Sequence, residues 1–187
     1  MSRLFLGTVL SAALVATVAV AADSASVGLK QGDPIGAFYV TKVAGAEADG
    51  VKSGSDLCYR CKYGQRPMVM VFTRSSGEKV TELVAELDKA VAANSDAQLR
   101  GFVTVMGSDQ SSLKSSAKKI AESSGAKQIP VTVALDSENG PANYQLDPKA
   151  EVTVIVADES QVVASHSFSA DSVDVAAVIK EVSQLLN

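Results

Sequence analysis

The sequence predicts an α/β fold in which a mixed β-sheet carries helices on both of its faces. Two observations lead to this prediction. Short apolar runs of the kind that form buried strands alternate along the chain with amphipathic helical patterns, and the chain then ends with a strand hairpin and a last helix. Strand–helix–strand units bring strands together in parallel, whereas a hairpin pairs them antiparallel, so the sheet should contain both kinds of pairing.

The first half of the chain predicts two strands and one strong helix. We expect a strand over residues 38–43, and then a loop rich in Gly, Ser and Asp that leads to the two cysteines. The apolar run after Pro67 predicts a buried central strand. In the next segment five residues share one helical face: Val80, Leu83, Val84, Leu87 and Val91. Ser75 and Glu78 have the spacing of a capping box at the start of this helix, and Asn94 is its expected end.

The second half predicts the remaining elements of the sheet. We expect strands over residues 99–106 and 129–136, separated by a weaker helix that ends at Gly125, and one helical turn around residues 142–145. The hairpin strands are EVTVIVAD and QVVASHSF, joined at the short turn Asp158-Glu159-Ser160. A last helix is expected from about Ser172.

The N-terminus predicts export. Arg3 precedes an uncharged apolar run, and Ala19-Val20-Ala21 fits a signal-peptidase site. We therefore assign residues 1–21 to a signal peptide, 22–31 to a short disordered segment and 32–187 to a single domain. The mature protein should be periplasmic or extracellular, without stable insertion in a membrane.

Charge and cysteine content limit the classes of function. The net charge is −4 and no block of like charge occurs, which argues against nucleic acid as a partner. Cys58 and Cys61 are the only cysteines, and in an oxidising compartment two cysteines at this spacing can form a disulfide. A CxxC pair is also half of a zinc site, and Cys-x-x-Cys-Lys resembles an unusual haem attachment sequence. His166 alone cannot complete a metal site, so we expect neither a metal nor another cofactor.

The order of the predicted elements resembles the thioredoxin-like superfamily, especially its redoxin branch of peroxiredoxins and exported thiol-disulfide carriers. The resemblance extends from Gly32 to Leu186. It is carried by the stretches GDPIGAFYVTKVAG, PMVMVFTRSSGEKV, IPVTVALD, ANYQL and EVTVIVADESQVV. This resemblance implies a thioredoxin-like domain and a protein thiol or disulfide as partner.

The chain departs from the family at the position of the reactive cysteine. The family places that cysteine at the first turn of the helix after the central strand, where free backbone N–H groups stabilise a thiolate. A peroxiredoxin-like Thr-x-x-Cys would fall on Thr73 and Ser76, so serine stands where the nucleophile would be. The family's cis-proline is also missing, because Ala150-Glu151-Val152 occupies its expected place. We expect Ser75 and Ser76 to cap the helix.

The displaced CxxC is the candidate site. Gly64 and Pro67 follow it closely, so we expect no long helix to begin at the pair and no stabilisation of a thiolate by a helix start. The three nearby cations Arg60, Lys62 and Arg66 should favour a thiolate and partly replace the stabilisation that a helix start would give.

Two functions remain open from the sequence. In the first, Cys58 or Cys61 attacks a partner's disulfide and the other cysteine resolves the mixed disulfide. In the second, the domain has no catalytic activity and binds a partner or has a structural role, and the disulfide closes a loop. A disulfide that closes a loop of four residues stabilises the fold by only about 2 kcal/mol, whereas a loop of 15 residues gives about 3 kcal/mol. We expect His166 to be a half-buried strand residue, and Tyr59, Tyr63 and Tyr144 to be packing or surface aromatics without a catalytic role.

Overall fold

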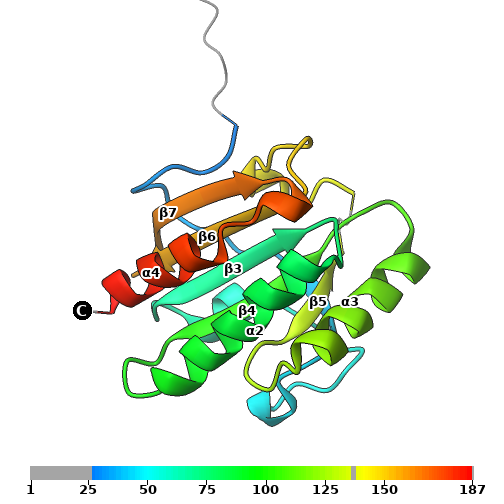
Figure 1. Cartoon of the computed structure of the whole chain (residues 1–187), viewed down its shortest axis with the longest axis horizontal. Helices are drawn as coiled ribbons and strands as arrows, with labels where there is room; N and C mark the ends of the chain where they lie inside the picture. Colours follow the sequence, from blue (N-terminus) through cyan, green and yellow to red (C-terminus); the bar gives the residue numbers. More distant parts are fainter. Residues whose placement is uncertain (1–26, 136–137, 187) are drawn as a thin grey trace, which may run out of the picture.

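A seven-stranded mixed sheet forms the centre of the protein (Figure 1). The structure is a computed structural model that describes residues 27–135 and 138–186; the predicted signal peptide lies outside these residues. The strands are β1 (Val40–Ala44), β2 (Asp56–Leu57), β3 (Met68–Thr73), β4 (Arg100–Val105), β5 (Val131–Ala134), β6 (Val152–Asp158) and β7 (Gln161–Phe168). Their order in the sheet is β2-β1-β5-β4-β3-β6-β7.

The sheet contains both kinds of strand pairing, as predicted. β3 pairs in parallel with β4 and β4 with β5, because each pair is joined by a crossover helix. On its other side β3 pairs antiparallel with β6, and β6 pairs antiparallel with β7 through the predicted hairpin. The expected strand–helix order and the mixed sheet are therefore confirmed.

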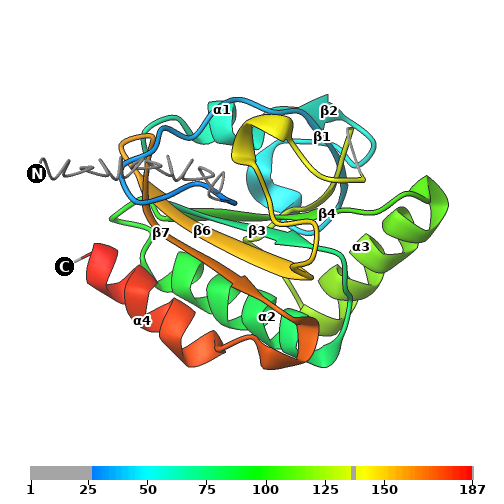
Figure 2. The same cartoon turned by 90° about the horizontal axis from the view of Figure 1, so that it is seen from above.

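Helices cover both faces of the sheet (Figure 2). They are α1 (Tyr59–Tyr63), α2 (Glu78–Ala93), α3 (Gln110–Ser124) and α4 (Val175–Leu185), with 3-10 turns η1 (Glu47–Asp49), η2 (Ala142–Tyr144) and η3 (Ala170–Ser172). The longer helices α2, α3 and α4 lie on one face, while α1 and η2 lie on the other. The CxxC segment and the helix α2 therefore belong to opposite layers.

The central strand β3 separates two hydrophobic cores. Val69 and Val71 face the core under α2, α3 and α4, whereas Met68, Met70 and Phe72 face the core under α1. All six residues of β3 are buried, because both faces of the strand are covered. This explains the uninterrupted apolar run after Pro67 and confirms the predicted central strand.

Some element boundaries differ from the prediction. The loop expected before the cysteines contains η1 and the two-residue strand β2, which is too short to leave a sequence period. Helix α2 begins after Gly77 without a side-chain cap, so the predicted capping box is wrong, while Asn94 is its C-cap as expected. Helix α4 begins after Asp174, whose carboxylate accepts the N–H of Ala177, and not at Ser172.

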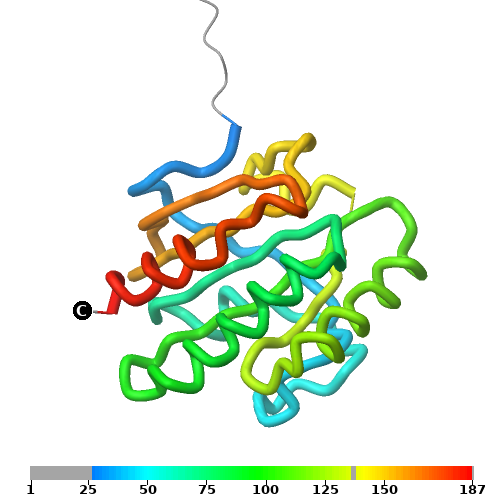
Figure 3. The backbone as a smooth tube through the Cα atoms, viewed as in Figure 1, coloured from blue at the N-terminus to red at the C-terminus, as the bar shows by residue number. Residues whose placement is uncertain are grey.

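The β6–β7 hairpin holds the N-terminal part of the described chain. Figure 3 shows this segment running beside the hairpin, and the N–H of Gly32 donates to the carbonyl of Val162 over 2.8 Å. Of the segment expected to be disordered, residues 27–31 are described, and the N–H of Gly28 donates to the carbonyl of Gln145. The predicted domain boundaries remain predictions.

Candidate redox site

Cys58 and Cys61 form a disulfide with their Cα atoms 5.2 Å apart. Cys58 is the N-cap of α1, and the N–H of Cys61 donates to its Sγ over 3.0 Å. The helix that begins at the pair has only five residues and ends at Gly64, which confirms that no long helix starts there. The contact from the N–H of Cys61 to Cys58 was not predicted. Gly64 has φ 67° and ψ −129°, a conformation that glycine adopts easily and that stops the helix.

The two cysteines differ in exposure. Cys58 is buried, with 7% of its surface accessible, between β2 and the core under α1. Cys61 lies one turn later on the outer side of α1 and is exposed. A molecule arriving from solvent therefore meets Cys61 first.

The three cations predicted to stabilise a thiolate lie around α1 but are held in different ways. Arg60 donates from Nε to the carbonyl of Ile35 over 3.1 Å. Arg66 donates to the side chain of Gln98 and to the carbonyl of Tyr63. Lys62 is exposed. Their effect on a cysteine pKa stays a prediction, since both sulfurs are in the disulfide.

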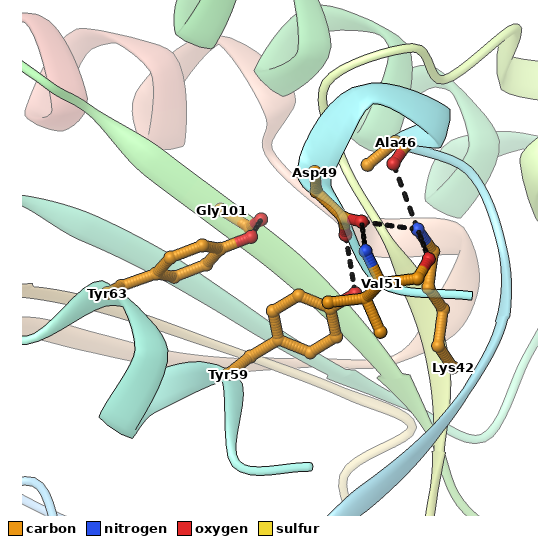
Figure 4. Close-up of polar contacts among 7 residues, drawn as sticks. All are labelled: Lys42, Ala46, Asp49, Val51, Tyr59, Tyr63 and Gly101. Carbon is orange, nitrogen blue, oxygen red and sulfur yellow. Dashed lines mark hydrogen bonds and ion pairs between the residues drawn. The ribbon is translucent and has the colours of Figure 1, made fainter. Parts of the chain in front are cut away.

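A buried polar network that the sequence did not reveal anchors Tyr59 of α1 (Figure 4). The Lys42 side chain is 2% exposed, and its ammonium donates to Asp49 at 2.8 Å and to the carbonyls of Ala46 and Val51, each at 2.9 Å. Asp49 also accepts the Tyr59 hydroxyl at 2.6 Å. This network fixes the residue next to Cys58 to the η1 turn. The only signal for it was a lysine inside a predicted strand.

The network shifts the pKa values of its members. Burial alone would raise the pKa of Asp49, but the hydrogen bonds from Lys42, Tyr59 and the N–H of Val51 outweigh it and lower that pKa. Burial, with the carboxylate of Asp49 nearby, raises the pKa of Tyr59 far above its ordinary value. Asp49 is therefore ionised and Tyr59 neutral at pH 7.

The three tyrosines, expected as packing or surface aromatics, are buried in the core on the α1 side of the sheet. The Tyr59 ring stacks near Phe102, with the ring centroids 5.7 Å apart, and Tyr63 lies 6.1 Å from the same ring. Tyr144 packs against Phe38 and Phe72 and donates its hydroxyl to the carbonyl of Gly36. Burial raises the pKa of both Tyr63 and Tyr144. Their packing role is confirmed.

The family position of the nucleophile contains no sulfur. Ser75 accepts the N–H of Gly77 on its hydroxyl, and the backbone N–H of Arg74 donates to the carbonyl of Glu151. Glu151 directly precedes β6, so the residue before the two serines lies beside the start of that strand. No cis peptide bond occurs in residues 27–135 and 138–186. The absence of a sulfur at the family position of the nucleophile is confirmed, and the altered position of the cis-proline stays a prediction.

His166 lies on β7, away from the cysteines. Its side chain is 38% exposed, and Nε2 lies 2.7 Å from the carboxylate of Glu181 on α4. This agrees with the expected half-buried strand residue. Across the described ranges, no group of three or more His, Cys, Asp or Glu side chains is arranged to hold a metal ion.

The sheet order and the flanking helices define a thioredoxin-like redoxin fold, in which the CxxC lies before the central strand β3. No family model matches the sequence, and no curated protein does.

Solved structures share this fold. AhpC from Mycobacterium bovis has a TM-score of 0.63 at 13% identity, covering 85% of this chain and 98% of its own. A Chlorobium tepidum protein provisionally described as the thiol:disulfide interchange protein DsbE has a TM-score of 0.62 at 14% identity, covering 85% and 99%. Thiol peroxidase from Chromobacterium violaceum has a TM-score of 0.55 at 16% identity, covering 84% and 88%. At these identities the likeness shows the fold alone.

Within the part of the chain that the structure describes, no helix is long and apolar enough to cross a membrane.

Proposed function

We propose that this chain is an exported thiol-disulfide exchange protein that acts through Cys58 and Cys61. The observation that carries the proposal is the asymmetry of the pair: Cys61 is exposed, whereas Cys58 is buried and accepts the N–H of Cys61. The neighbours with thiol chemistry in their names add support through the shared fold.

The asymmetry assigns different roles to the two sulfurs. A partner thiolate attacks Sγ of Cys61, the Cys58–Cys61 bond breaks, and Cys58 leaves as a thiolate that the N–H of Cys61 stabilises. The second thiolate of the partner then attacks the partner sulfur in the mixed disulfide, and Cys61 leaves. Two electrons pass from the partner dithiol to the pair, and two protons end on the new thiols at neutral pH. In the reverse direction Cys61 attacks a partner disulfide and Cys58 resolves it.

This order of roles is opposite to the family's usual motif, in which the N-terminal cysteine attacks. The reason is local: in this chain the N-terminal cysteine is buried and the C-terminal one is exposed. Arg60, Lys62 and Arg66 would favour the thiolate forms of the reduced pair.

The reactivity of single-cysteine variants tests the assignment. In Cys58→Ser the remaining Cys61 should react with Ellman's disulfide at least about 10-fold faster than the remaining Cys58 does in Cys61→Ser, because access limits the buried thiol. Cys58→Ser should also accumulate a mixed disulfide that wild type resolves. Faster reaction of Cys58 would reverse the roles, and no reaction of either thiol in the folded state would refute exchange.

The alternative is a catalytically inactive redoxin-fold module in which the disulfide fixes a loop. The burial of Cys58 and the serine at position 76 favour this alternative. It predicts a pair that is hard to reduce, so the reduction potential separates the two functions.

Export is the remaining part of the proposal. The apolar run at the N-terminus supports export. Export is also supported by the disulfide, because disulfides persist in oxidising compartments. Mass spectrometry of the protein from a cell fraction outside the cytoplasm should find a mature chain that begins at Ala22. A full-length chain in the cytoplasm would refute export.

A further inference from the structure

We propose that a concave site beside α1 binds a small polyanion, meaning a molecule with two or more carboxylate or phosphate groups. This cationic pocket has a volume of about 380 Å³ and is lined by Lys62, Arg66, Arg100, Lys127, Asp49 and Tyr63, among others. The inference does not rest on the exchange chemistry proposed for the cysteines.

The charge of the pocket is opposite to that of the whole protein. Its four cations come from four parts of the chain: α1, the loop after it, the start of β4 and the loop before β5. Of the lining residues that the structure describes, only Asp49 carries a carboxylate, and its oxygens already accept hydrogen bonds from Lys42, Tyr59 and the N–H of Val51. The whole chain carries a net charge of −4, whereas the lining of this pocket is positively charged.

The four cations have no acidic partner within residues 27–135 and 138–186. The ion pairs found there are Lys42–Asp49, Lys79–Glu82, Lys89–Glu86 and His166–Glu181. The two arginines are instead held by neutral acceptors. Arg66 donates to Gln98 at 2.7 Å and to the carbonyl of Tyr63 at 2.8 Å. Arg100 donates to the carbonyl of Leu99 at 3.0 Å.

These bonds position the guanidinium groups without neutralising them. Each arginine keeps N–H groups for an incoming anion, and a fixed guanidinium can bind a carboxylate or phosphate through two parallel hydrogen bonds. Holding the side chain in advance also reduces the entropy lost on binding.

The wall that carries Lys127 is fixed in a similar way. One carboxylate oxygen of Asp88 accepts the backbone N–H groups of Lys127, Gln128 and Ile129, at 2.9, 2.6 and 2.9 Å. This clamp ties the loop before β5 to α2. Asp88 is not part of the pocket lining, so its charge does not occupy the site.

The size of the pocket favours a small molecule over an acidic segment of a protein. About 380 Å³ is at the lower end of the range for small-molecule sites, which is about 300–1,000 Å³. Single contacts between exposed charges are weak and are screened by salt, so one acidic group would gain little. A ligand with two or more anionic groups can contact several of the cations together.

Isothermal titration calorimetry at low salt with pyrophosphate and with citrate tests the proposal. The test variant is Lys62→Gln/Lys127→Gln, which removes two cations from the lining. The matched control is Lys114→Gln/Lys180→Gln, which removes two exposed lysines on α3 and α4 and changes the net charge equally. All four positions are exposed, so both variants should fold, and circular dichroism checks this.

The proposal predicts that wild type binds at least one probe with a Kd of about 1 mM or tighter. The test variant should lose about 10-fold or more in affinity while the control changes less than about 2-fold. Equal losses in both variants, or no binding at about 10 mM probe, would overturn the proposal. A hexaglutamate peptide is the third probe; if it binds and the small anions do not, the pocket recognises an acidic protein segment instead.

Discussion

Replacing Asp49 by asparagine should strongly destabilise the protein. Among residues 27–135 and 138–186, Asp49 carries the only carboxylate that contacts Lys42, whose side chain is 2% exposed (Figure 4). The amide of Asp49→Asn can still accept a hydrogen bond, but it has no charge. The ammonium of Lys42 would stay buried without a counter-ion.

The size of the effect follows from this geometry. Removing one partner of a buried ion pair costs about 3–5 kcal/mol, because the other charge stays desolvated. Two carbonyl oxygens still accept hydrogen bonds from Lys42 in the variant, so we expect a loss at the lower end of this range, about 3 kcal/mol. Lys42→Met/Asp49→Asn should be more stable than the sum of the single changes by at least about 1 kcal/mol.

Urea unfolding followed by circular dichroism at pH 7 measures these free energies. A loss below about 0.5 kcal/mol in Asp49→Asn, or strictly additive single changes, would show that the pair does not stabilise the fold.

The pH dependence gives an independent check of the same prediction. Since the pKa of Asp49 is lowered in the folded state, its contribution is present above its unfolded pKa of about 3.9 and is lost as the pH falls through the lower folded value. Wild type should therefore lose more stability than Asp49→Asn when the pH is lowered from 5 toward the folded pKa. Parallel curves for the two proteins would contradict this.

Two further predictions concern the same part of the fold. Gly45→Ala should lower the free energy of unfolding in urea by at least about 1 kcal/mol more than Gly50→Ala does. Both glycines have left-handed φ values, of 73° and 76°, but only at Gly45 would the new Cβ lie 2.3 Å from the carbonyl oxygen of Ile129. Equal losses would show that the backbone relieves this contact. Tyr63→Phe should resist alkaline unfolding better than wild type. Burial raises the pKa of Tyr63, so the stability that its neutral side chain contributes is lost as the pH rises above about 10. Identical unfolding curves for the two proteins at about pH 11 would refute this.

The strand and helix pattern could be predicted because each element buries a continuous apolar set. β3 is buried on both faces, and the apolar residues of α2 repeat at helical spacing, so local sequence and tertiary structure agree. Helix starts were harder to predict. Ser75 and Glu78 fit a capping box, but the backbone turns at Gly77 and Ser75 accepts an N–H before the helix begins.

The candidate site could be predicted only in part from the sequence, for a different reason. Cys58 and Cys61 were visible as a motif, and the missing sulfur at Ser76 followed from the order of elements. The unequal exposure of the cysteines could not be predicted, because it depends on which side of a five-residue helix faces the sheet. The network around Lys42 and the cationic pocket join segments far apart in sequence, and spacing carries no signal of such contacts.

The reduction potential of the Cys58–Cys61 pair tests the central claim most directly. Equilibration with glutathione buffers at pH 7, followed by alkylation and mass spectrometry, measures it. Exchange chemistry predicts a value between about −270 and −120 mV, the range of known exchange proteins. A value below about −300 mV would mark a structural disulfide and contradict the proposed function.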